Sequence, residues 1–202
     1  YYQAMIFHTS PFINHICGSL GSYHKAILCN LQSRILSTWG VKGTLPRNGK
    51  GVTTGQYAEV HRIFSDDDLR SFSRLVGDPN PIHISGHDVS SLLPEGVSPV
   101  LQKSGLLSGR PLVHGMLAAS LFSCIFGTLI PGSVYRNQQL NFIKPIFAGD
   151  PVIGKVYVEK LKTLRHGLLL KCKTEVVLEK DLTICIDGNA MVWLPAAIPK
   201  QL

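Results

Sequence analysis

The segment from Asp78 to His83 places a carboxylic acid, an amide and an imidazole within six residues. Pro79 and Pro81 fix their own φ angles and push the residues before them, Asp78 and Asn80, toward extended conformations, so the segment cannot continue a helix. Polar side chains on a stiff loop could place a general acid beside a general base. By spacing alone the segment favours an ordinary turn over a catalytic loop, because Asp-Pro and Asn-Pro pairs often begin turns.

Metal chemistry is the alternative use of such residues. His83 and His87 have helical spacing and Asp88 follows them, but no His-Glu-x-x-His pattern or third ligand of matching spacing accompanies the pair. The five cysteines form no Cys-x-x-Cys pair, and those at 124, 172 and 185 fall in apolar runs, which favours core packing in a reducing compartment. We therefore predict no metal and no cofactor.

A short helix must end just before this segment. Ser65 is a good N-cap, and the three aspartates after it complement the positive end of a helix. Apolar residues then recur at helical spacing and predict one buried face, namely Leu69, Phe72, Leu75 and Val76. Gly77 ends the helix, and an alternating run from Tyr57 to Phe64 predicts a strand before it.

The run from Val113 to Ile130 is apolar on all sides, which predicts a helix buried all round. With 18 residues it is at the lower limit for crossing a bilayer. Polar residues within it argue against a membrane span, namely His114, Ser120, Ser123 and Thr128. We predict a core helix.

Four long strands follow, at 133–143, 151–163, 167–178 and 182–194, separated by turn signals. In the third, alternate residues from Leu170 to Leu178 form one buried face and the lysines between them a wet face. Asp187-Gly188 predicts a bulge in the last strand more than a hairpin turn. The order predicts an α+β fold whose antiparallel meander wraps the long helix, although another α+β sandwich also fits the pattern.

The N-terminal part differs in composition from the rest. No acidic residue precedes Glu59, while five cations do, and they account for +5 of the formal net charge of +7. The remainder is nearly balanced, so we expect no nucleic-acid partner. An acid-free, basic, Ser-containing start favours an organellar transit peptide over 1–40, rather than a disordered leader without an address. Arg34-Ile35-Leu36-Ser37-Thr38 resembles a matrix-processing site, so we expect a mitochondrial matrix location and not a chloroplast one. Five glycines and one proline between Gly40 and Gly55 predict a linker over 41–55, with the folded domain at 56–202.

Two motifs resemble a known family. Phe72-x-x-Leu75-Val76-Gly77-Asp78-Pro79-Asn80-Pro81-Ile82-His83 is similar to the signature of the MaoC-like, or hydratase 2, family, and the run from Pro111 to Ser123 is similar to its central-helix entry. The resemblance covers about 56–195. It implies a hot-dog fold, a sheet wrapped around a long central helix. It also implies a homodimer that joins two sheets edge to edge, with the pocket at the interface.

The resemblance implies reversible addition or removal of water across the 2,3 double bond of an acyl thioester, with R stereochemistry at the hydroxyl. Asp78 and His83 would be the acid and base, with either at C2, and Asn80 would support the loop. The amide of Gly115 would bind the thioester oxygen, while Ser123 and Phe126 would border the acyl pocket. His114 would be a structural hydrogen-bonding residue.

The expected function is dehydration of (3R)-hydroxyacyl chains on acyl carrier protein, in mitochondrial type II fatty acid synthesis. Hydration of 2-enoyl-CoA in oxidation is the first alternative. A non-catalytic acyl-binding hot-dog module and a hot-dog thioesterase are the others. The chain departs from the family pattern at Val76, at Val89 and in the long stretch 90–109, which affects the expected shape of the pocket more than its chemistry.

Overall fold

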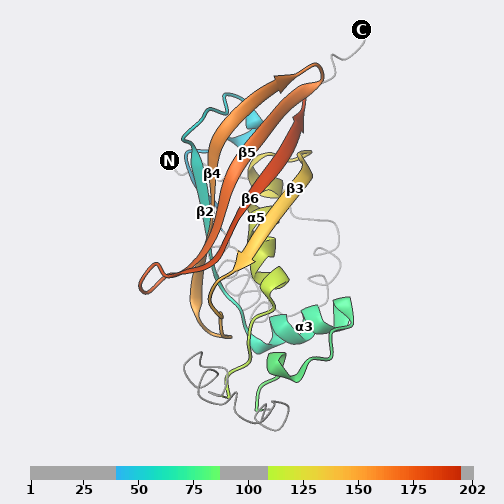
Figure 1. Cartoon of the computed structure of the whole chain (residues 1–202), viewed down its shortest axis with the longest axis vertical. Coiled ribbons are helices and arrows are strands. Elements are labelled where there is room, and N and C mark those ends of the chain that lie inside the picture. Colours follow the sequence, from blue (N-terminus) through green and yellow to red (C-terminus); the bar gives the residue numbers. More distant parts are fainter. Residues whose placement is uncertain (1–39, 87–108, 197–202) are drawn as a thin grey trace, which may run out of the picture. The chain divides into compact units, whose positions relative to one another are not determined.

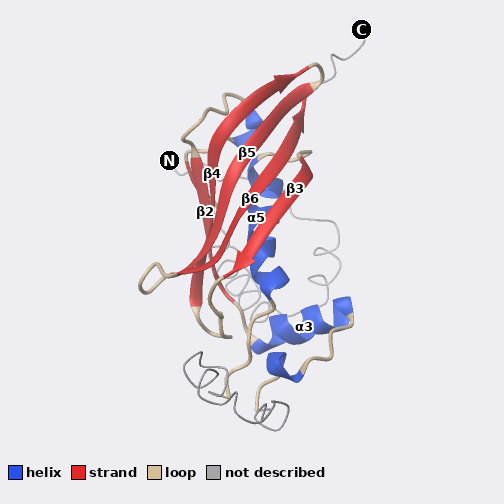
Figure 2. Cartoon of the chain, viewed as in Figure 1, coloured by secondary structure: helices blue, strands red, loops and turns tan. Residues whose placement is uncertain are grey.

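A six-stranded antiparallel sheet curves around one helix (Figures 1 and 2). The computed structural model describes residues 40–86 and 109–196, so the predicted transit peptide, His87, Asp88 and most of the stretch 90–109 lie outside the described residues. The sheet order is β1-β2-β4-β5-β6-β3. Its strands are β1 (Lys42–Gly43), β2 (Tyr57–Ile63), β3 (Val134–Phe142), β4 (Pro151–Leu164), β5 (Gly167–Leu178) and β6 (Ile184–Pro195).

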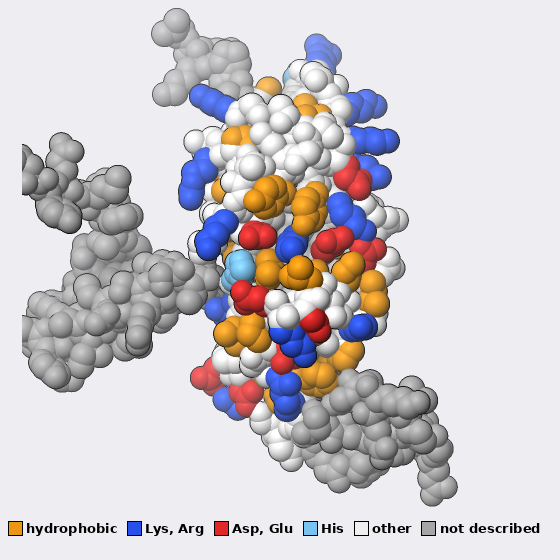
Figure 3. Space-filling view, turned by 90° about the vertical axis from the view of Figure 1, so that its left-hand side faces the viewer, with side chains coloured by type: hydrophobic (Ala, Val, Ile, Leu, Met, Phe, Trp, Pro, Cys, Tyr) orange, Lys and Arg blue, Asp and Glu red, His pale blue; other side chains and the backbone are white. Residues whose placement is uncertain are grey.

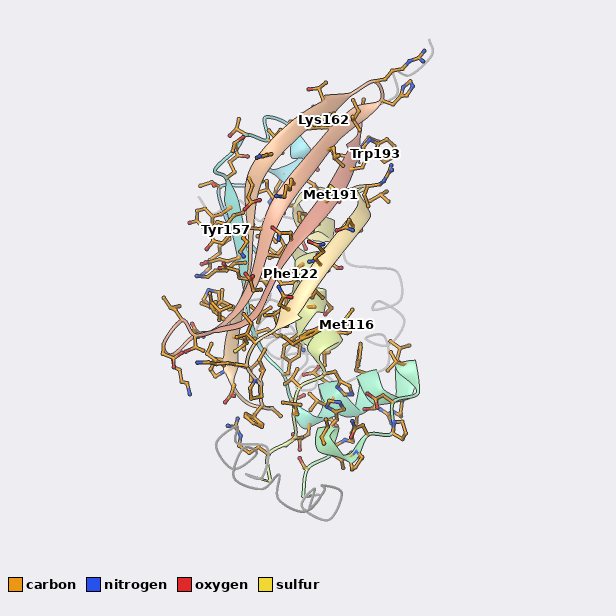
Figure 4. The ribbon with its side chains drawn as sticks, viewed as in Figure 1. Met116, Phe122, Tyr157, Lys162, Met191 and Trp193 are labelled. Carbon is orange, nitrogen blue, oxygen red and sulfur yellow. The ribbon has the colours of Figure 1, made fainter. Side chains whose placement is uncertain are left out.

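The strands form because their apolar residues alternate, and β5 follows the predicted pattern. Leu170, Cys172, Thr174 and Val176 are fully buried, whereas Lys171 between them is exposed. The buried face packs on helix α5 (Gly115–Leu129), and Phe122, labelled in Figure 4, is 1% exposed in this layer. Burial raises the pKa of the Cys172 thiol to about 12, as expected for a cysteine that serves as core. The hot-dog arrangement predicted from the sequence is confirmed.

Two details of the predicted sheet were wrong. β3 does not pair with β4, as a meander of four successive strands requires; it pairs with β6 at the opposite edge. The bulge in β6 lies at Cys185, where the partners of Ile184 and Ile186 are adjacent residues of β5, and Gly188 keeps regular register. Gly188 is needed for a different reason, since a Cβ there would lie 2.1 Å from the Gln139 carbonyl oxygen of β3.

Helix α5 is buried on the side of the sheet and not all round. Ala118, Phe122 and Ile125 are buried, but one stripe along the helix is exposed in the single chain: Met116, Ser120, Ser123 and Gly127. The reason is that the sheet wraps only one side of the helix. Across residues 40–86 and 109–196, every helix falls short of the length and hydropathy that a bilayer crossing requires.

The predicted linker 41–55 belongs to the folded unit. Lys42 pairs with Glu59 and Gly43 with Ala58, so β1 extends the sheet beyond β2. Leu45 and Val52 are buried in the core, and a 3-10 helix, η1 (Arg47–Gly49), lies between them. The glycines of this segment serve turns that hold it against the sheet, so the folded unit begins at Gly40 and not at Gln56.

The second helix, α3 (Asp66–Val76), begins and ends where the sequence predicts. Ser65 and Asp68 form a reciprocal capping box, and Gly77 adopts the left-handed conformation after the last turn. The predicted apolar face is only partly covered. Leu69 is fully buried, whereas Leu75 is 81% and Val76 53% exposed, because nothing among the described residues packs over the last turn.

The surface charges on one face of this unit are mixed. Figure 3 shows Lys and Arg side chains there, with acidic and apolar side chains beside many of them. Among the ion pairs of the sheet, Lys171 lies 3.4 Å from Glu159, and His61 lies 3.1 Å from Glu179. The cations of the sheet are therefore at least partly balanced by local acids.

Candidate active site

The end of helix α3 fixes the backbone of Asp78. The Ser73 carbonyl oxygen accepts hydrogen bonds from the amides of Gly77 (2.8 Å) and Asp78 (3.0 Å), which closes the last turn. This closure needs Gly77 at φ 73°, a conformation that residues with a Cβ adopt only at a cost. The carboxylate of Asp78 is thereby held one residue beyond a rigid helix.

Asn80, expected to hold the loop or a water, makes two hydrogen bonds within the loop, one through its backbone amide and one through its side chain. Its amide donates to Asp78 Oδ1 at 3.0 Å, and its own side-chain oxygen accepts from the Ile82 amide at 3.3 Å. These two bonds begin a single 3-10 turn, η2 (Pro81–His83), with Pro81 at its first position. The turn aims His83 back toward the end of α3 and leaves Asp78 Oδ2 for other contacts.

His83 is held in one tautomer. Its side chain is 8% exposed, and Nδ1 lies 2.6 Å from the Leu112 carbonyl oxygen. A carbonyl oxygen only accepts, so Nδ1 carries the proton and the lone pair of the neutral ring is on Nε2. Nε2 lies 3.7 Å from Asp78 Oδ2. The two residues singled out by the sequence are therefore brought together, with a basic nitrogen beside a carboxylate.

A second imidazole, that of His114, lies against this pair. Its ring stacks on His83 with centroids 3.6 Å apart and planes inclined by 19°. Its Nε2 is 3.0 Å from Ser73 Oγ and 3.8 Å from Asp78 Oδ2. Neither Ser73 nor the closeness of His114 to Asp78 was predicted. The only signal in the sequence was a polar residue at the start of an apolar helix.

The cluster of Asp78, His83 and His114 has the composition of a metal site, since its ligand atoms lie within 4.8 Å of one another. Its geometry does not suit one. The lone pairs of imidazole nitrogens lie in the ring plane, and those of two nearly parallel stacked rings do not converge on one ion. His83 Nδ1 is also already bonded to a carbonyl oxygen. The residues present fit acid–base chemistry better than metal binding.

Two hollows adjoin this cluster. The first, of about 420 Å³, has Asp78 and His83 in its wall, together with Ser73, Arg74 and other residues of α3 and its loop. The second, of about 450 Å³, is lined by apolar residues, by Lys144 and by Gly115, the first residue of α5. Leu112 lines the second hollow while its carbonyl holds His83 at the first.

Gly115 permits the Phe142 ring to lie close to the start of the helix. A Cβ there would lie 2.5 Å from the Phe142 ring, and the first amides of a helix have no partner within it. The amide of Gly115 therefore stands at the positive end of α5, next in sequence to His114. That Asp78, His83 and this amide face one another across one pocket stays a prediction, since the two hollows have different walls in the single chain.

Ser123 and Phe126 have different surroundings. Ser123 lines a third hollow of about 300 Å³ between α5 and β3, with Met116, Tyr135 and Gln138. Phe126 is 2% exposed and packs edge-on against Tyr135 with centroids 5.5 Å apart. Burial raises the pKa of Tyr135 to about 12, and a hydrogen bond with Ser123 partly opposes this rise. Ser123 stays a candidate for the acyl pocket, whereas Phe126 belongs to the core beside it.

Comparison with known proteins agrees with the fold. No family model matches the chain. It is 31% identical over 144 residues to the mitochondrial 3-hydroxyacyl-[acyl-carrier-protein] dehydratase of Arabidopsis thaliana, covering 71% of this chain and 78% of that protein. It is 31% identical over 150 residues to an (R)-specific enoyl-CoA hydratase of Aeromonas caviae, covering 73% and 99%.

A solved structure of the same class of enzyme is also similar to this chain. The (R)-hydratase of A. caviae involved in PHA biosynthesis superposes with a TM-score of 0.58 at 29% identity, over 72% of this chain and 99% of that one. A curved sheet around one helix defines a hot-dog fold, and the similar proteins are named dehydratases and hydratases, which are hydro-lyases. The chain belongs to the MaoC-like, or hydratase 2, family of dehydratases and hydratases.

Proposed function

We propose that the protein removes water from (3R)-hydroxyacyl chains carried on acyl carrier protein, within mitochondria. The observation that carries this proposal is the pairing of Asp78 Oδ2 with His83 Nε2, 3.7 Å apart in a hollow at the surface. Elimination needs a base for the C2 proton and an acid for the departing C3 hydroxyl. Two groups of different proton affinity on one wall supply both, and they act on the same face of the substrate.

The hydrogen bonds indicate which atoms of His83 and Asp78 can exchange a proton with the substrate. Neutral His83 has its lone pair on Nε2 and accepts a proton there, while Leu112 keeps the other nitrogen protonated. Asp78 Oδ1 is occupied by the Asn80 amide, so Oδ2 is the oxygen that exchanges a proton. One residue takes the C2 proton as the C2–H bond breaks, and the other gives its own proton to the C3 hydroxyl, which leaves as water as the C3–O bond breaks and the C2=C3 bond forms. Transfer of one proton between Asp78 Oδ2 and His83 Nε2 then restores the pair. Either residue can take the C2 proton in this geometry.

The charge that develops on the thioester oxygen needs a donor. We assign this role to the Gly115 amide, because it stands at the positive end of α5. A donor of this kind is typically worth about 10²-fold to 10³-fold in rate. Ser123, on the exposed side of the same helix, then borders the acyl chain.

The choice of carrier rests on relatives. Proteins of tomato and Arabidopsis thaliana that are 29% and 31% identical to this chain are named mitochondrial 3-hydroxyacyl-[acyl-carrier-protein] dehydratases. The acid-free N-terminal segment agrees with mitochondrial import and a matrix location. Hydration of enoyl-CoA is the second candidate, because the A. caviae relative carries that name.

The test is an assay of the full chain on (3R)-hydroxyacyl thioesters of acyl carrier protein and of CoA. We expect turnover of both, with a higher kcat/KM on carrier protein that falls steeply with salt, because carrier protein is acidic. Asp78→Asn and His83→Ala should each lower kcat by about 10²-fold to 10⁴-fold, the usual worth of a general acid or base.

Two variants serve as matched controls, Asp181→Asn and His166→Ala, which change the same residue types in exposed turns. Both should keep the activity of the unmodified chain. Full activity in Asp78→Asn or His83→Ala would refute the site. A higher kcat/KM on CoA, with little salt dependence, would favour the hydratase of oxidation.

We further propose that two identical chains form the working unit. Strand β3 pairs only with β6 among the described strands, so its other edge offers unpaired backbone groups to a partner. The exposed stripe of α5 and the hollow around Ser123 lie beside this edge. A second copy joined along β3 would extend the sheet and cover both.

A further inference from the structure

His114 makes more contacts with the acid–base pair than a core residue needs. It is 4% exposed, stacks on His83 and approaches Asp78. The His114 ring also makes an edge contact with the Phe72 ring of α3, with centroids 4.9 Å apart. One imidazole therefore joins the helix before the loop, the loop itself and the start of α5.

The hydrogen bonds of His114 make it a poor proton acceptor. Its Nε2 is bonded to Ser73 Oγ, whereas Nδ1 is buried and has no hydrogen-bond partner among the described residues. A proton on Nε2 would point at the Ser73 hydroxyl and toward the Asp78 carboxylate, which is the favourable arrangement beside an anion. In that tautomer Nε2 has no lone pair to offer the substrate.

The titratable groups around the ring support a neutral state. Burial lowers the pKa of His114, the neighbouring His83 lowers it further, and Asp78 opposes both. Ser73 and Phe72, which face it from α3, carry no charge. A neutral ring adds no positive charge beside His83 and so leaves His83 free to accept a proton.

We propose that His114 is a positioning residue of the dehydratase, bound to Ser73 so that it fixes the ring plane of His83 and the carboxylate of Asp78. This inference rests on the proposed function of the pair. The bond from His83 Nδ1 to Leu112 leaves the ring free to tilt about one atom, and stacking on a second, anchored ring restrains this tilt. Ser73 serves both partners, since its carbonyl holds the Asp78 amide and its hydroxyl holds His114.

The variants that test this proposal distinguish stacking by the His114 ring from hydrogen bonding by its nitrogen. His114→Phe keeps an aromatic ring to stack on His83 but loses the bond to Ser73, and Ser73→Ala loses the same bond from the other side. Each should lower kcat by about 10-fold to 100-fold with little change in KM, the scale expected for a displaced catalytic group. The double variant should be no worse than His114→Phe, because both changes remove one interaction.

Two changes serve as controls. Ser71→Ala removes a hydroxyl from the same helix that accepts a hydrogen bond from the exposed Arg74 side chain, and it should leave kcat unchanged. Ser73→Thr keeps the hydroxyl and should restore most of the activity lost in Ser73→Ala. If His114→Phe does not fold, the pair of Ser73 variants decides the question.

The inference is overturned if Ser73→Ala, or a folded His114→Phe, keeps the kcat and pH profile of an active unmodified chain. It is also overturned if Ser73→Thr is as slow as Ser73→Ala. Lack of turnover by the unmodified chain would count against the proposed function instead. In that event ¹⁵N spectra of the histidines still decide: Ser73→Ala should shift the ring signals of both His83 and His114, and unchanged signals would exclude the positioning role.

Discussion

At the scale of single residues, the local spacing of Asp78, Asn80 and His83 fitted a turn, and it was the resemblance to a family signature that made the segment an expected acid–base loop. Neither could identify the groups that hold the loop. Asn80 caps the turn because it lies two residues from each partner. Leu112 and His114 are distant in sequence and reach His83 only because the chain returns at the start of α5. Spacing contains no information on such contacts.

The lowered pKa of His114 predicts how the folding stability depends on pH. Its folded pKa lies below the ordinary value of 6.5, so the unfolded chain binds the proton more readily. The contribution to folding stability is therefore present above about pH 6.5 and is lost as pH falls through the lowered folded pKa. Thermal unfolding at about pH 7.5 and about pH 5 should show a larger loss of Tm in the unmodified chain than in His114→Phe.

The comparison cancels the contributions of the other titrating groups, because the two proteins differ at one residue only. Equal losses of Tm on acidification would show that the fold does not disfavour protonation of His114. The neutral ring proposed for the site would then have no support from stability.

At the scale of elements, the boundaries of α3 were predictable because its signals are local. Ser65 caps the first turn, and Gly77 supplies the positive φ that closes the last. The predicted linker failed for the converse reason. Glycines and a proline indicate turns, but the burial of Leu45 and Val52 depends on the sheet they meet.

Gly77→Ala tests whether this helix end is a part of the site. A Cβ would meet nothing within 4 Å, so the loss of folding stability comes only from the left-handed backbone at φ 73° and is about 1 kcal/mol. The strain should open the bonds from Ser73 to the Gly77 and Asp78 amides and lower kcat by about 10-fold. Chemical denaturation and the thioester assay measure the two effects.

Gly132→Ala is the matched control, since Gly132 has φ 83° and equally open surroundings in the turn after α5. It should lose similar stability and keep its activity. If both variants lose activity alike, the effect of Gly77→Ala is one of general stability and not of positioning Asp78.

At the scale of the whole molecule, the sequence predicted a wrapped helix but not which strand lies at the edge. Alternating apolar residues predict a strand but not the strand with which it pairs. The turn after β3 allowed pairing with β4 equally well. Only the folded chain places β3 beside β6. A helix that is apolar on all sides was likewise read as fully buried, although one chain covers only one side of it.

The proposed dimer makes the last prediction. Ser120 lies in the exposed stripe of α5, and Ser120→Arg would place a charge where a second copy is expected to pack. Light scattering should give twice the mass of one chain for the unmodified protein and a shift toward one chain for the variant. Lys162→Glu, which changes charge on the distant β4–β5 hairpin (Figure 4), should leave the mass unchanged. Because the pocket is proposed to lie at the interface, Ser120→Arg should also lose activity in step with its mass. An unmodified protein that is monomeric and fully active would refute the dimer and require the described chain alone to complete the site.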